Sequence, residues 1–116
     1  MKTKFLLITL MLTAFSNLNA QSYNDLWEDV NKDLENRLPQ SAETILNKIE
    51  QKAVEENNQK ELLKSYVYRF RIFELSEEEP LETSINFAAR NVANLQEPER
   101  AIFNIAIASL YETYMI

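Results

Sequence analysis

Residues 59–77 read QKELLKSYVYRFRIFELSE, and this stretch decides the fold. One apolar line at helical spacing consists of Leu62, Leu63, Tyr66, Val67, Phe70 and Phe73. A second apolar line, at intervals of four and three, consists of Tyr68, Ile72 and Leu75. A helix that is apolar on two faces is covered by neighbours on both. We therefore predict that residues 59–77 form the central helix of an all-α domain.

Helical periodicity on both sides of this stretch predicts four more helices. With the central one, the predicted helices comprise residues 23–37, 39–56, 59–77, 80–95 and 98–116. The residues expected at their ends are Ser22 as an N-cap, Pro39, Pro80 and Pro98 as openings, and Asn57-Asn58 as a turn. Serine accepts a free amide of the first turn, proline needs no partner there, and asparagine tolerates left-handed backbone. The short links favour about five antiparallel helices, arranged as a helical-repeat-like stack or a bundle.

The first twenty residues are predicted to be a secretory signal peptide. Lys2 and Lys4 precede an uncharged, leucine-rich run of eleven residues, Phe5 to Phe15, and a short polar stretch ends at Ala20. This order is typical of signal peptides, and the apolar run is shorter than the ~20 residues that span a bilayer. We expect cleavage after Ala20, with an uncleaved signal anchor as the alternative. The domain division is then a signal peptide, 1–20, and a helical module, 21–116.

Composition excludes most kinds of catalytic site. The 116 residues include no His, no Cys and no Gly, which removes thiolate nucleophiles, the usual proton shuttle and glycine-rich phosphate loops. Residues 1–20 hold two of the 12 basic residues and none of the 18 acidic ones, so residues 21–116 carry a net charge of −8. That charge disfavours nucleic acid and anionic membranes as partners. We predict no catalytic residue, no cofactor and no metal site.

Two charged segments have the composition of binding sites, one for nucleic acid and one for calcium, and we predict a structural role for each. The run from Tyr66 to Arg71 mixes basic and aromatic residues, as single-stranded nucleic-acid sites do. Because of the net charge and the expected export, we predict instead that Arg69 and Arg71 pair with nearby acids. The acids Glu77, Glu78, Glu79 and Glu82 lack the pattern of a calcium loop and are expected to be solvated.

The last predicted helix is apolar over about 200° of its circumference, against about 100° for an ordinary surface helix. The candidate interface residues are Phe103, Ile107, Leu110, Tyr111 and Tyr114. If four of these side chains (Phe103, Ile107, Leu110 and Tyr114) stayed in water, the burial free energy lost would be ~6–12 kcal/mol. That loss rivals the ~5–15 kcal/mol stability of a domain. We therefore expect this face to meet a missing downstream helix, a second copy or another protein, and the module to be incomplete at its C-terminal end. The alternative is a five-helix bundle that encloses its last helix.

Several short motifs between residues 23 and 73 carry a resemblance. They are Tyr23-Asn24-Asp25-Leu26-Trp27, Leu38-Pro39-Gln40-Ser41-Ala42, Ile45-Leu46-Asn47-Lys48-Ile49, Glu55-Glu56-Asn57-Asn58 and Leu62-Leu63-Lys64. In these the chain resembles the N-terminal helical region of Bacteroidetes-type alpha-2-macroglobulin family proteins. Members are long exported proteins with many β-sandwich domains, some of which trap proteases through a Cys–Gln thioester. This chain has no Cys, so the resemblance implies only the leading helical module, or a fragment, and no trapping residue.

These observations together predict a non-catalytic, exported helical module, periplasmic or secreted. Its partners would be downstream domains of a larger macroglobulin-like envelope protein or another protein, with no nucleic acid and no membrane span once the signal is removed. A free-standing adaptor that self-associates as a homo-oligomer is the alternative. A small enzyme or ligand binder that uses acids and tyrosines is the remaining alternative of another class; it requires a carboxylic acid whose pKa is raised in an apolar pocket.

Overall fold

The computed structural model describes the backbone of residues 21–115 and the side chains of residues 21–113. The predicted signal segment, 1–20, and the side chain of Tyr114 lie outside the described residues. The elements are α2 (Tyr23–Glu35), α3 (Pro39–Glu56), α4 (Gln59–Ser76), α5 (Pro80–Asn91), the 3-10 helix η1 (Val92–Asn94) and α6 (Glu99–Met115). This described part contains no strand, so the all-α prediction is confirmed.

The helix ends follow from local side-chain chemistry. The hydroxyl of Ser22 accepts the amide of Asp25 at 3.2 Å and caps α2. The side chain of Asn58 accepts the amide of Glu61 at 3.3 Å and caps α4. Asn57, at the end of α3, has the predicted left-handed backbone with φ 52°. Ser22 and the Asn57-Asn58 turn are therefore confirmed.

The turn between α2 and α3 adds a feature that the residue pattern did not predict. Arg37 has φ 56°, and the amides of Arg37 and Leu38 donate to the carbonyls of Leu34 at 3.1 Å and Asp33 at 2.8 Å. This is a Schellman motif, whose left-handed position is usually glycine. In a chain without glycine, arginine holds that position at a conformational cost.

We expect Arg37→Gly to raise the free energy of unfolding by about 1 kcal/mol, because glycine adopts positive φ without a Cβ clash. Chemical denaturation followed by circular dichroism measures the change. Asn36→Gly is the matched control: Asn36 has φ −85°, so glycine there should destabilise by about 0.5–1 kcal/mol. Equal effects of the two substitutions would show that the left-handed backbone of Arg37 carries no strain.

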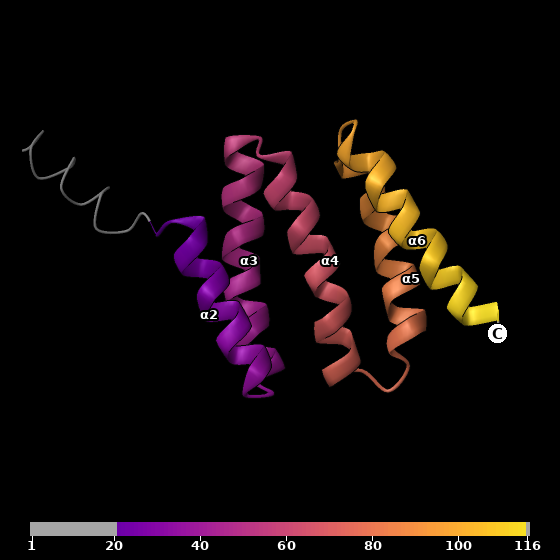
Figure 1. Ribbon diagram of the computed structural model, residues 1–116, viewed down its shortest axis with the longest axis horizontal. Coiled ribbons are helices and arrows are strands. Elements are labelled where there is room, and N and C mark those ends of the chain that lie inside the picture. The colour runs from indigo at the N-terminus through magenta and orange to yellow at the C-terminus, as the bar shows by residue number, and fades with distance from the viewer. Residues whose placement is uncertain (1–20, 116) are drawn as a thin grey trace, which may run out of the picture.

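The helices form an open row. Figure 1 shows α2 to α6 side by side in chain order, with successive helices antiparallel and with α2 and α6 at opposite ends. Helix α4 packs on α3 at one side and on α5 and α6 at the other, which confirms its predicted central place. The arrangement therefore corresponds to the stack and not to a closed bundle around the last helix.

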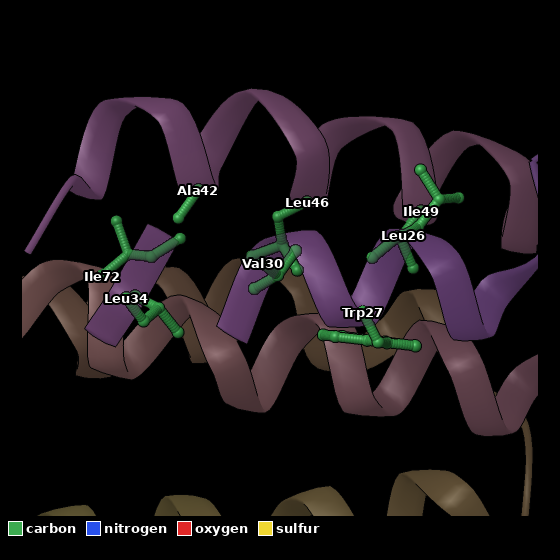
Figure 2. Close-up of a cluster of buried hydrophobic side chains, with 8 residues drawn as sticks. All are labelled: Leu26, Trp27, Val30, Leu34, Ala42, Leu46, Ile49 and Ile72. Carbon is green, nitrogen blue, oxygen red and sulfur yellow. The ribbon is translucent and has the colours of Figure 1, made fainter. Parts of the chain in front are cut away.

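One buried cluster lies between α2, α3 and α4 (Figure 2). It consists of Leu26, Trp27, Val30, Leu34, Ala42, Leu46, Ile49 and Ile72. Figure 2 shows Leu46 of α3 beside Val30 of α2, as the apolar line on each helix requires. Trp27 is 5% exposed, and its ring centroid lies 4.6 Å from that of Tyr68 on α4. Trp27 is therefore a core residue.

A second buried cluster lies among α3, α4, α5, α6 and the residue that follows η1. It consists of Ala53, Leu62, Tyr66, Ala88, Leu95 and Phe103. Leu95 was predicted to continue the helix that Pro80 opens, yet α5 ends at Asn91 and Leu95 has extended backbone with ψ 148°. The side chain is buried, but the predicted helix boundary was wrong. The 3-10 helix and the extended residue turn the chain back toward α6.

Candidate functional site

Helix α6 is the element on which the predicted interface depends, and its start is held by hydrogen bonds. The amide of Gln96 donates to the side-chain oxygen of Gln59 at 2.7 Å, which ties the preceding loop to the start of α4. The guanidinium Nε of Arg100 donates to the carbonyl of Leu95 at 2.8 Å. The amide of Ala101 donates to the Glu97 carboxylate at 3.2 Å. These contacts set the direction in which α6 leaves the loop.

The inner face of α6 packs on aromatic rings of α4. Phe103 is fully buried, and its ring centroid lies 5.6 Å from that of Tyr66 and 6.0 Å from that of Phe70, with the Phe70 ring stacked at 7°. The Tyr66 ring also contacts Phe87 of α5 edge-on at 5.6 Å. Such aromatic pairs contribute ~0.5–1.5 kcal/mol each beyond area burial. The placement of Phe103 in an interface was therefore wrong, since this residue belongs to the core of the chain.

The other candidate interface residues follow Phe103 at helical spacing and differ from it in burial. Ile107 is half-buried and packs against the second cluster, and Leu110 is half-buried as well. Tyr111 is 47% exposed. The structure therefore buries Phe103, brings Ile107 against the core and leaves Tyr111 on the surface, while the side chain of Tyr114 lies outside the described residues.

Two isoleucines that were not among those candidates form the exposed apolar side of α6. Ile102 is 52% exposed and Ile105 is 69% exposed. They are three residues apart and so lie on one side of the helix, which we call the outer face of α6. Ala101, Ala108 and Ser109 are exposed on or beside this face, and the Ser109 hydroxyl donates to the Ile105 carbonyl at 3.2 Å.

The periodicity of residues 98–116 could not separate these two sides of the helix. Apolar residues cover most of its circumference, so both the Phe103 side and the Ile105 side satisfy helical spacing. A usable signal was the size of the side chain, because a large ring such as Phe103 packs well against the rings of Tyr66 and Phe70 on the central helix. Phe103 therefore faces inward, and Ile105 is left outside.

Arg69 is the most buried charged group of α4. Its side chain is 10% exposed, and its Nη2 donates to the Glu50 carboxylate at 2.6 Å and to the Asn47 side chain at 2.5 Å. The Glu43 carboxylate lies 3.7 Å from Nη1. The Arg69 Nε is buried and has no hydrogen-bond partner among the described residues. The predicted pairing of Arg69 with acids is confirmed, and this cation is not available to grip a phosphate.

Arg71 differs from Arg69. Its guanidinium carbon lies 5.6 Å from the centre of the Tyr68 ring, and within residues 21–113 no carboxylate forms an ion pair with it. Of the two arginines that were expected to pair with acids, Arg71 was therefore predicted wrongly. It is exposed and packs on an aromatic ring instead.

Two tyrosines, Tyr23 and Tyr66, have raised pKa values and stay protonated at neutral pH. Burial raises the pKa of Tyr66, whose hydroxyl accepts a hydrogen bond from Asn94 at 3.3 Å. Burial and the hydrogen bond that Tyr23 donates to Glu56 at 2.8 Å raise the pKa of Tyr23 to about 12. Both phenols can donate hydrogen bonds, but neither is poised to act as a general base.

The acidic residues show no cation site. The hydrogen bond and charge of Glu79 raise the pKa of Glu82, a fully exposed group. Across residues 21–113, no three His, Cys, Asp or Glu side chains lie close enough together to hold a metal ion.

None of the described helices has the length and apolar character required to cross a membrane. Comparison with protein-family models, with curated proteins and with solved structures finds no match to this chain. The resemblance of residues 23–73 to macroglobulin-type proteins therefore stays a prediction. The features of the structure that bear on function are the exposed apolar side of α6 and the charged side chains of α4.

Proposed function

We propose that this chain is a non-catalytic, exported helical module that binds a helix of another protein or protein segment through the outer face of α6. The carrying observation is the exposure of Ile102 and Ile105 on the helix that ends an open row. Because the two side chains are already partly buried, covering them fully would contribute ~1–2 kcal/mol for each. The small residues beside them allow a further helix to approach closely and extend the stack.

The electrostatic balance favours a different protein over a second copy. Residues 21–116 carry a net charge of −8, so two copies repel each other. In this proposal the covering helix belongs to a larger envelope protein of the macroglobulin-like kind or to a separate partner. The non-catalytic part of the proposal is supported by the absence of His and Cys and by the neutralised Arg69.

Photo-crosslinking in the source cells tests this proposal. A benzoylphenylalanine at position 105 of the full chain is expected to yield one discrete crosslinked product in the envelope fraction, because that position faces the partner. Position 54 is the matched control, since Val54 is 62% exposed but lies on α3 and not on α6. Equal crosslinking at both positions, or a product with the mass of two chains, would contradict the proposal.

The substitution Ile105→Glu gives the corresponding loss of binding. We expect it to weaken the partner complex about tenfold or more, because a carboxylate in the centre of an apolar interface costs ~1.4 kcal/mol or more. The thermal unfolding of the isolated chain should change little, since substitutions at exposed positions stay within about 0.5 kcal/mol. Val54→Glu should leave the complex intact. A complex that tolerates both substitutions would exclude the outer face of α6.

A further inference from the structure

Three cations form a line along the exposed side of α4. Lys60, Lys64, Val67 and Arg71 recur at intervals of four, three and four residues, so they lie along one side of the helix. All four are exposed, and we call them the basic line of α4. Among the residues that the structure describes, ion pairs involve only Lys52 and Arg69 as cations. The three charges of the basic line are therefore not neutralised by a neighbouring carboxylate.

Aromatic rings position two of these cations. The Lys64 ammonium lies 4.3 Å from the centre of the Trp27 ring and 5.8 Å from that of Tyr68. The Arg71 guanidinium lies on the same Tyr68 ring, at 5.6 Å. A cation over an aromatic face is attracted to it by ~0.5–1 kcal/mol at exposed sites. The side chains of Lys64 and Arg71 are thus ordered before a partner binds, which reduces the conformational entropy lost on binding.

Hydrogen bonds hold the two rings in turn. The Tyr68 hydroxyl donates to the Asn31 side chain of α2 at 3.1 Å. The Trp27 indole Nε1 donates to the Glu61 carboxylate at 2.5 Å. The basic line is therefore set on a fixed α2–α4 contact, in the middle of the row that Figure 1 shows.

The dimensions of the line suit one helix. Lys60 and Arg71 are eleven residues apart, which corresponds to about 16 Å along an α-helix. Carboxylates at the same spacing on a second helix would lie opposite the three cations, with a small apolar side chain opposite Val67. A nucleic acid needs more positive contacts than three, and the net charge of −8 over residues 21–116 repels a polyanion at long range.

From this geometry and charge we propose that the basic line of α4 docks an acidic helical segment of another protein. Complementary charge would determine which segment binds and increase its rate of association. This surface is separate from the outer face of α6, so either proposal can fail without the other.

A titration of the full chain with a synthetic peptide tests the docking surface. The probe is an alanine-based helical peptide with glutamates at positions 1, 5 and 12 and alanine at position 8, added to ¹⁵N-labelled protein at low salt. We expect amide shifts concentrated at residues 60–71 and a dissociation constant that rises at least tenfold in K60Q/K64Q/R71Q. The matched control, K32Q/K48Q/R90Q, removes the same charge from exposed positions on three other helices and should change affinity less than twofold.

Several results would overturn the proposal. They are equal loss in the two triple variants, no binding of the peptide, and tighter binding of oligothymidylate or phosphatidylglycerol vesicles than of the peptide. Shift changes caused by dimerisation of the chain would also overturn it. If K60Q/K64Q/R71Q fails to fold, Lys60→Gln alone decides, because no aromatic contact of Lys60 is present within residues 21–113. It should weaken the peptide complex about threefold, and unchanged affinity would contradict the docking surface.

Discussion

Replacing Phe103 by alanine is expected to lower the free energy of unfolding by about 3–5 kcal/mol. The side chain is fully buried and contacts the rings of Tyr66 and Phe70 from a different helix. Its removal leaves a cavity between α4 and α6 and breaks two aromatic contacts at once. Urea denaturation of the variant and of the unmodified chain, followed by circular dichroism, measures the difference.

The control is Ile102→Ala, one residue away on the same helix. Ile102 is 52% exposed, so the same kind of truncation should cost less than about 1 kcal/mol. This comparison separates the core side of α6 from its outer face. If Phe103→Ala were as mild as Ile102→Ala, Phe103 would be a surface residue and the packing of α6 described here would be wrong.

Replacing Glu50 by leucine is expected to destabilise the chain by about 2–4 kcal/mol, because it leaves the buried Arg69 guanidinium without its close carboxylate. Asn47 and the more distant Glu43 remain, but neither replaces a charged partner at 2.6 Å. The Glu50 side chain is 28% exposed, so some solvent screening reduces the cost below that of a fully buried pair.

A double-mutant cycle distinguishes a missing partner from simple loss of packing. Arg69→Met combined with Glu50→Leu removes both charges, and we expect it to recover most of the stability lost in Glu50→Leu. Lys52→Gln serves as the control, since it breaks the exposed pair with Glu56 and should cost less than about 1 kcal/mol. Additive single effects, with no recovery in the double variant, would show that Arg69 and Glu50 are not energetically coupled.

Most of the secondary structure could be predicted from local patterns. The openings at Pro39 and Pro80, the cap at Ser22 and the left-handed Asn57 depend on chemistry within one helical turn. The central place of residues 59–76 followed from a second apolar face, which only a helix with neighbours on both sides requires. The end of α5 was placed too late, because Leu95 fits the helical spacing although its backbone is extended.

The candidate site could be predicted only in part. The exposed isoleucines of α6 are Ile102 and Ile105, whereas the predicted interface residue Phe103 is buried and Ile107 packs against the second cluster. Arg69 and Arg71 looked alike as neighbours in one basic-aromatic run. The structure pairs the first with Glu50 and stacks the second on Tyr68.

The sequence by itself determined that the chain is helical, where most of its helices begin, and that its central helix is covered on two faces. These properties depend on residues within a few positions of one another, whose spacing is visible in the chain. The tertiary structure alone decided which side of α6 faces inward and which arginine is neutralised. Those outcomes depend on rings and carboxylates that reach the site from other helices, and periodicity along one helix does not contain their positions.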